Sequence, residues 1–162
     1  MMKIRPFQKE DWQVVSRIYQ EGMDTNIATF ETQCPDWETW NSKFLQKCRI
    51  VIEENDQVLG WAALSSASKR AVYKGVVEVT IYIDLSYHGK RIGTRLMNAL
   101  VEASEAAGFW MLQSSIFSEN KPSIQLHLRA GFRILGTREK IAKRNGIWKD
   151  TVFMERRSNL IY

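Results

Sequence analysis

Residues 83–96 combine a polar, glycine-containing turn with basic side chains and the start of an amphipathic helix. The segment reads Ile-Asp-Leu-Ser-Tyr-His-Gly-Lys-Arg-Ile-Gly-Thr-Arg-Leu. Backbone N–H groups at a helix N-terminus bind phosphate, helped by the helix dipole, and Lys90, Arg91 and Arg95 add positive charge. The glycine spacing fits neither a Walker A loop nor a dinucleotide-binding loop. The pattern therefore predicts a phosphate or pyrophosphate site, with an ordinary solvent-exposed loop as the alternative.

A single carboxylate, Glu78, lies inside the strand-like run of residues 76–84, which is otherwise largely apolar. The two-residue period of a strand places the valines and isoleucines on one face, and Glu78, Thr80 and Tyr82 on the other. Burial raises the pKa of a carboxyl group, and such a group can act as a general base near neutral pH. Glu78 is therefore a candidate base, and the alternative is a buried glutamate that pairs with an arginine.

A second motif follows about 30 residues after the predicted phosphate loop, at residues 120–132. Asn120 is followed by Ser at +3, His at +7, Gly at +11 and Phe at +12. This pattern resembles the last helix of the GNAT superfamily of acetyl-CoA-dependent N-acetyltransferases. The loop at residues 88–93 resembles the pyrophosphate-binding motif of the same superfamily. Both motifs occur in the order that the superfamily has.

Further blocks resemble the phosphinothricin and methionine sulfoximine acetyltransferase branch of that superfamily. They are residues 26–32, 70–73, 78–83, 123–127 and 146–150, together with Pro35 and Trp40. The resemblance implies an α+β (mixed α/β) GNAT fold in one domain over residues 1–162. It also implies a mixed, largely antiparallel, twisted sheet of about six to seven strands with four flanking helices. The implied enzyme transfers acetyl from acetyl-CoA to the amino group of a small amino-acid-like substrate by direct attack on the thioester.

The resemblance also implies how acetyl-CoA is held, with no metal. Members bind the pantetheine arm along a strand as a partial extra strand, and the pyrophosphate at the loop and helix start. The implied cofactor residues are Ile81, Tyr82, Ile83, Gly89, Lys90, Arg91, Ile92, Gly93, Thr94, Asn120 and Ser123. Asn120 could instead simply cap the helix that follows it.

The pyrophosphate loop departs from the family pattern at two positions. His88 stands where the family usually has Gln or Arg, and Arg91 stands at the usual first glycine. If that position needs a left-handed backbone, an arginine there is costly. We nevertheless expect cofactor binding to survive.

The resemblance assigns chemical roles to Glu78 as the base, directly or through a water, and to His127 as the acid for the leaving thiolate. His127 occupies the position where many members have a tyrosine, and imidazole can donate a proton near neutral pH. A core histidine is the alternative. The implied substrate residues are Phe30, Arg70, Glu78, Val79 and Thr80, in a homodimer. Arg70 suits a carboxylate clamp and Phe30 an apolar side chain, with a surface arginine and a core phenylalanine as alternatives.

The elements that must position these residues can be read from hydrophobic periodicity and turn residues. Asp36 is placed as an N-cap, Gly22 as a helix end, and Asn145-Gly146 as a hairpin turn. We predict helices over residues 10–22, 37–44, 92–107 and 121–130. We predict strands over residues 3–7, 49–54, 58–65, 76–84, 109–117, from 132, and 147–155. This order of elements predicts an α+β or α/β fold around a partly antiparallel sheet.

Composition limits the alternatives. The chain has 162 residues, 44% of them hydrophobic, and a net charge of +5, with nine basic and three acidic residues between Arg129 and Arg157. A nucleic-acid-binding module is the non-enzymatic alternative, but no nucleic-acid-binding motif is present, so we expect no such partner. Other acceptor amines, such as protein N-termini, polyamines or aminoglycosides, stay open. Two cysteines without a C-x-x-C motif, and no apolar run long enough for a bilayer, predict a cytoplasmic protein without a membrane partner.

Overall fold

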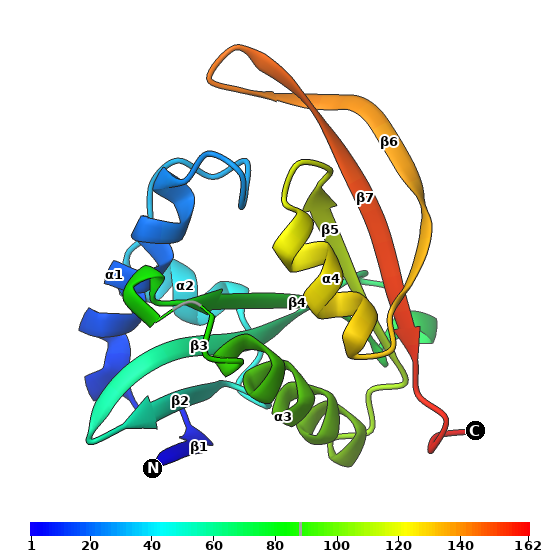
Figure 1. Ribbon diagram of the computed structural model, residues 1–162. Coiled ribbons are helices and arrows are strands. Elements are labelled where there is room, and N and C mark those ends of the chain that lie inside the picture. The colour runs from blue at the N-terminus through cyan, green and yellow to red at the C-terminus, as the bar shows by residue number, and fades with distance from the viewer. Residues whose placement is uncertain (88) are drawn as a thin grey trace.

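The computed structural model describes residues 1–87 and 89–162, and within them the chain forms a seven-stranded sheet flanked by four α-helices (Figure 1). The strand order is β1-β2-β3-β4-β5-β7-β6. The strands are β1 (Met2–Pro6), β2 (Ile50–Glu54), β3 (Gln57–Ser66), β4 (Val76–Ile83), β5 (Met111–Phe117), β6 (Arg133–Arg144) and β7 (Ile147–Arg157). The helices are α1 (Trp12–Asp24), α2 (Trp37–Lys43), α3 (Ile92–Ala106) and α4 (Lys121–Arg129). Short 3₁₀ helices occupy Lys9–Asp11, Ala71–Tyr73 and Leu85–Tyr87.

All neighbouring strands pair antiparallel except β4 and β5, which run parallel. Their ladder is short, with register partners only from Val76↔Met111 to Glu78↔Gln113. Beyond this point the two strands diverge, while β5 stays paired with β7 along its whole length (Figure 1). Residues 79–82 of β4 therefore keep their pairing with β3 and have no register partner in β5.

Each face of the sheet has its own apolar core. On one face, α3 and α4 cover alternate strand residues such as Ile52, Leu64 and Val79. On the other, α1 and α2 enclose an aromatic cluster in which Trp40 and Trp61 are almost fully buried, with ring centroids 5.5 Å apart. Truncating either indole to alanine would cost about 3–5 kcal/mol. The sheet is thus fixed from both sides.

The predicted elements and the α+β fold class are confirmed, and one local expectation is wrong. Asp36 caps α2 as expected, because its side chain accepts a hydrogen bond from the Thr39 N–H at 2.9 Å. Gly22, however, does not end α1, which continues to Asp24. A Cβ on Gly22 would lie 2.4 Å from Cδ1 of Tyr82, so the glycine lets the helix approach the β4 strand closely.

The last two strands form a long hairpin that extends past the end of β5 (Figure 1). Its turn is at Asn145 and Gly146, both with positive φ, as the Asn-Gly pair predicts. Across residues 1–87 and 89–162, no helix has the length and apolar character needed to span a membrane.

Candidate active site

Glu78 lies at the point where β4 and β5 separate, because its pairing with Gln113 is the last of the parallel ladder. Its side chain is half-buried, and no hydrogen bond or ion pair to it is found within the part of the chain that the structure describes. Burial raises the pKa of the Glu78 carboxyl group, and the charge of Lys43 at the end of α2 opposes this rise only in part. The site therefore presents an unpaired carboxylate with an increased affinity for protons.

The face of the sheet that carries Glu78, here called the Glu78 face, extends along both diverging strands. The alternation of β4 adds Thr80 and Tyr82 to this face. On β5, the register with Gln113 puts Phe117 on the same face. Tyr82 packs against Trp61 and Tyr19 with centroid separations of 5.6 and 4.9 Å, and burial raises the pKa of its hydroxyl.

The connection between α1 and α2 bridges the diverging strands on the Glu78 face. The Thr29 side chain lies beside the Tyr82 hydroxyl of β4. The next residue, Phe30, contacts Phe117 of β5 edge to face, with centroids 4.7 Å apart. Phe30 is therefore brought to the same face as Glu78, and it packs on a phenylalanine of its own chain.

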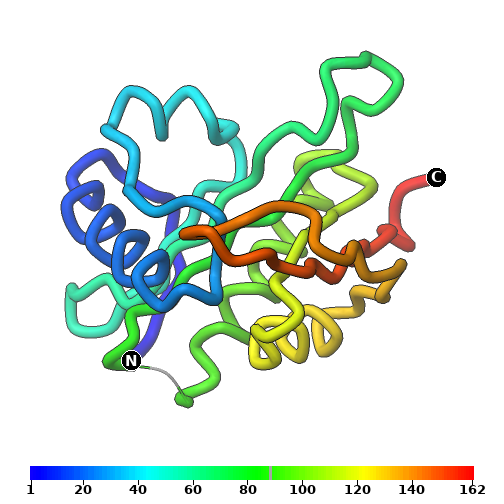
Figure 2. Tube along the Cα trace, turned by 90° about the horizontal axis from the view of Figure 1, so that it is seen from above, coloured from blue at the N-terminus to red at the C-terminus, as the bar shows by residue number. Residues whose placement is uncertain are grey.

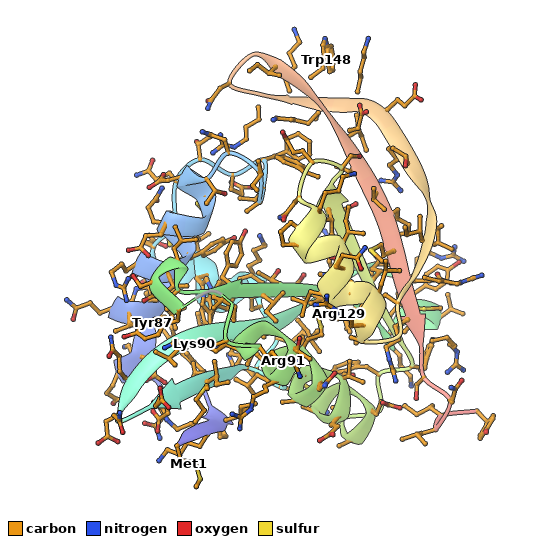
Figure 3. The ribbon with its side chains drawn as sticks, viewed as in Figure 1. Met1, Tyr87, Lys90, Arg91, Arg129 and Trp148 are labelled. Atoms are coloured by element: carbon orange, nitrogen blue, oxygen red, sulfur yellow. The ribbon has the colours of Figure 1, made fainter. Side chains whose placement is uncertain are left out.

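The predicted phosphate loop leads directly into α3. The first hydrogen bond of this helix runs from the Arg95 N–H to the Arg91 carbonyl at 3.1 Å, so the N–H groups of Ile92, Gly93 and Thr94 belong to a first turn that has no intrahelical acceptors. Lys90 and Arg91 are exposed at this helix end, and Lys90 lies over the Tyr87 ring at 5.5 Å (Figure 3).

Arg91 is the N-cap residue of α3 and has φ +58° and ψ +20°, in the left-handed region. The position therefore has the backbone that favours the glycine of the family pattern, and arginine is strained there by about 1 kcal/mol. Gly89, at φ +90°, takes the other unusual backbone of the loop. His88 lies outside the described residues.

At the start of α4, Asn120 acts as a cap, because its side-chain oxygen accepts a hydrogen bond from the Ser123 N–H at 3.3 Å. The Ser123 carbonyl in turn lies 2.7 Å from Nδ1 of His127. A carbonyl can only accept, so we assign the proton of the neutral ring to Nδ1 and an unprotonated lone pair to Nε2.

His127 is 2% exposed, and its ring meets Phe132 edge to face at 4.9 Å. Within residues 1–87 and 89–162, its Nε2 has no hydrogen-bond partner. Burial lowers the pKa of His127, although the hydrogen bond to Ser123 acts in the opposite direction. The neutral ring therefore offers Nε2 as an acceptor, and the predicted role as an acid needs a second proton.

The remaining predicted site residues lie in three different environments. Val79 is 7% exposed, and its side chain belongs to the core under α3, on the face opposite Glu78. Ile81 and Ile83 pack against that same core. Arg70 lies on the exposed β3–β4 connection, which projects from the rest of the chain, and it stacks over Tyr73 at 5.3 Å (Figure 2). Thr80 is thus the predicted substrate residue whose side chain shares the face of Glu78 and Phe30.

Two residues beside the Glu78 face, Thr29 and Phe117, are not among the site residues predicted from the sequence. An open groove of about 930 Å³ lies elsewhere, among Phe7, Trp37 and the last turn of α3, and no predicted site residue lines it. We therefore place the candidate site where β4 and β5 diverge and the connection between α1 and α2 bridges them.

The sequence profile of the acetyltransferase (GNAT) family matches residues 11–132. The chain belongs to the GNAT acetyltransferase family. This GNAT chain is 34% identical over 99 residues to an L-methionine sulfoximine/L-methionine sulfone acetyltransferase of Pseudomonas aeruginosa. That match covers 61% of this chain and 58% of the relative, which is less than two thirds of the relative's length.

Other relatives match over most of the chain. An L-amino acid N-acyltransferase, MnaT, of Escherichia coli is 25% identical over 159 residues, which are 95% of this chain and 92% of the relative. The crystal structure of a GNAT phosphinothricin acetyltransferase from Sinorhizobium meliloti, in complex with acetyl-CoA, superposes with a TM-score of 0.84 at 27% identity. It covers 99% of this chain and 95% of the other. The expected GNAT fold and its seven-stranded, mostly antiparallel sheet are confirmed.

Proposed function

We propose that this protein is a cytoplasmic, acetyl-CoA-dependent N-acetyltransferase that acetylates the amino group of a small amino-acid-like substrate. Methionine sulfoximine, methionine sulfone and phosphinothricin are the candidate acceptors, in keeping with the names of the relatives. The observation that carries the proposal is the position of Glu78, an unpaired, half-buried carboxylate at the divergence of β4 and β5. The unpaired thiols of Cys34 and Cys48 agree with a reducing compartment.

The residues at the start of α3 fit the pyrophosphate of coenzyme A. The N–H groups of Ile92, Gly93 and Thr94 are the donors that a phosphate needs at a helix N-terminus, and Lys90 and Arg91 add exposed positive charge. Residues 79–82 of β4 lack a partner in β5, which supports a pantetheine arm added as a partial strand. When bound, acetyl-CoA supplies an acetyl group activated as a thioester.

Glu78 then acts as the general base. An α-ammonium group is largely protonated at neutral pH, and it must lose a proton before its nitrogen can attack the thioester carbonyl. The raised pKa of Glu78 increases the affinity of the carboxylate for that proton, which it takes directly or through a water. As the new C–N bond forms and the C–S bond breaks, the nitrogen loses a second proton, and one proton is needed by the sulfur.

His127 is the second catalytic candidate, as the acid that donates a proton to the sulfur. Its hydrogen bond to the Ser123 carbonyl leaves Nε2 unprotonated in the neutral ring. The proposed acid role therefore requires the imidazolium form, which burial disfavours. Glu78 is the better supported of the two catalytic residues.

The acceptor side chain would lie beside Phe30 and Phe117, whose two aromatic rings are suited to contact with an apolar side chain. Arg70 is the proposed clamp for the acceptor carboxylate, and its guanidinium has a single stacking partner, Tyr73, in the described part of the chain. Thr80 shares the Glu78 face, whereas Val79 can reach the acceptor only through its backbone.

We also propose that the protein is a homodimer. Five large apolar side chains of the β6–β7 hairpin are between 43% and 62% exposed: Ile134, Leu135, Ile141, Ile147 and Trp148. Trp148 lies at the tip of this hairpin (Figure 3). Several large apolar side chains exposed on one hairpin support a protein interface. Sedimentation velocity tests this, and a monomer at every concentration would contradict it.

The function is tested by incubating the protein with acetyl-CoA and each candidate acceptor, and by following the release of free thiol. We expect thiol release that depends on the acceptor, with an acetylated product that mass spectrometry detects. Failure with all amines, together with no acetyl-CoA binding in calorimetry, would overturn the proposal. Acetylation of other amines alone would retain the enzyme class and reject the proposed acceptors.

A further inference from the structure

Arg144, the last residue of β6, ties the hairpin tip to the connection that follows α1. Its side chain is buried, with 5% exposure. The Nε–H donates to the Thr29 carbonyl at 2.9 Å, and one terminal N–H₂ group donates to the Met23 carbonyl at 2.7 Å. The other terminal group donates to Oδ1 of Asn26. Three neutral acceptors, all more than 100 residues away in the sequence, thus bind one guanidinium.

The charge of Arg144 is not compensated by a carboxylate. Among residues 1–87 and 89–162, its hydrogen bonds go only to carbonyl and amide oxygens, and no ion pair includes it. A buried cation is costly unless its donors are well hydrogen-bonded. The planar guanidinium can reach three separate acceptors at once, which the single ammonium of a lysine does less well. The arrangement therefore depends on arginine specifically.

The segment that Arg144 holds lies over the Glu78 face. The Thr29 carbonyl accepts a hydrogen bond from Arg144, and the Thr29 side chain lies beside the Tyr82 hydroxyl of β4. Phe30 follows directly and packs on Phe117 of β5. Asn26 lies between Met23 and Thr29 in the sequence and has a left-handed φ of +66°. Its side-chain amide oxygen accepts a hydrogen bond from Arg144. The guanidinium thus fixes the backbone immediately before Phe30.

We propose that Arg144 is a positioning residue that sets acceptor binding by holding Thr29 and Phe30 over the Glu78 face. This inference rests on the proposed function, because it assigns the acceptor to that face. Arg144 acts through the loop and does not touch the reacting atoms. It should therefore control how tightly and how selectively the acceptor side chain is held, while acetyl-CoA binding at the start of α3 is unaffected.

The test compares Arg144→Lys and Arg144→Met with the wild-type protein. Displacement of Thr29 and Phe30 is expected to lower kcat/KM for the acceptor by about 10- to 100-fold, through a higher KM for the acceptor. The KM for acetyl-CoA should stay within about twofold. Amide hydrogen exchange should become faster in residues 24–33. Lys143→Gln is the matched control, because Lys143 is an exposed neighbour over the Trp148 ring and its loss removes the same charge.

Asn26→Gly keeps the proposal testable if Arg144→Met does not fold. Glycine accepts φ +66° without strain but removes the amide oxygen that binds Arg144. A higher acceptor KM with an unchanged acetyl-CoA KM would support the proposal, and Asn26→Asp, which restores an acceptor, should recover the wild-type value. Wild-type acceptor kinetics in all Arg144 and Asn26 variants would overturn it. So would a loss of stability with no selective effect on the acceptor.

The acetyltransferase activity and the positioning role of Arg144 are tested separately by these experiments. If the wild-type protein acetylates none of the candidate amines, the proposed function fails, whatever the variants do. If it acetylates an amine and the Arg144 variants match the wild-type acceptor KM, only the positioning role fails.

Discussion

Glu78 of β4 lies opposite Gln113 of β5 in the last register pair of the parallel ladder. One residue later β4 has lost β5 as a neighbour, so this carboxylate stands where the sheet opens. A partly buried carboxylate at such an opening can meet a ligand between the strands and still be shielded enough for its pKa to rise.

The first prediction concerns catalysis by Glu78. Glu78→Gln keeps the side-chain volume but removes the base, so kcat should fall by about 100- to 10,000-fold. The dissociation constant for acetyl-CoA, measured by calorimetry, should change by less than about twofold, because the pyrophosphate is held at the start of α3 and the pantetheine arm by the backbone of β4. Glu102→Gln on the exposed side of α3 is the control and should leave both quantities unchanged. Equal loss of turnover and cofactor affinity would instead make Glu78 structural.

The second prediction follows from the raised pKa of Glu78. The native state holds the Glu78 proton more tightly than the unfolded chain does. In the unfolded chain the pKa of this carboxyl group is near 4.5. The contribution of Glu78 to stability is therefore most favourable below pH 4.5 and is lost as the pH rises through the folded pKa. At pH 7–8 the Glu78→Gln variant should have a higher Tm than the wild-type protein, and the difference should shrink toward pH 4. Thermal unfolding followed by circular dichroism checks this, and a lower Tm at pH 7–8 would contradict it.

The third prediction separates the backbone and the charge of Arg91. Arg91→Gly removes the left-handed strain of about 1 kcal/mol but loses some of that gain to glycine's greater freedom in the unfolded chain. Arg91→Ala keeps the strain. The glycine variant should therefore be more stable than the alanine variant in urea unfolding.

Both Arg91 variants also lose the guanidinium, so both should bind acetyl-CoA a few-fold more weakly, by about 1 kcal/mol, and with less salt dependence. Unchanged affinity in both would mean that only the backbone of residue 91 serves the cofactor. Weaker binding in the alanine variant alone would assign the effect to backbone strain.

The fourth prediction concerns the contact between Gly22 and Tyr82. Alanine is a better helix former than glycine by about 1 kcal/mol, yet Gly22→Ala should destabilise the protein by about 1–3 kcal/mol, because its Cβ would overlap the Tyr82 ring. Gln13→Ala at an exposed site of α1 should be neutral or slightly stabilising. Urea unfolding gives both values, and a stabilised Gly22→Ala variant would show that the ring moves away at little cost.

Much of the fold could be predicted from local sequence. The alternation of side chains along β4 placed Glu78, Thr80 and Tyr82 on one face. The Asn145-Gly146 pair marked the hairpin turn, and Asp36 marked the start of α2. Each of these features depends on a residue's own backbone preference or on neighbours within a few positions. Family resemblance supplied the fold class and the candidate site residues.

The tertiary structure decided what depends on contacts between distant residues. Gly22 looked like a helix end and is a point of close approach to Tyr82, 60 positions away. Arg144 belongs to the basic stretch between Arg129 and Arg157, which its charge alone would place on a solvent-exposed face. Its buried hydrogen bonds to Thr29 and Asn26 exist only because the hairpin tip folds back onto the loop after α1. The sequence by itself determined the elements and the chemistry they carry. Only the packing of segments distant in the sequence determined which side chains surround Glu78, because no local preference encodes such a contact.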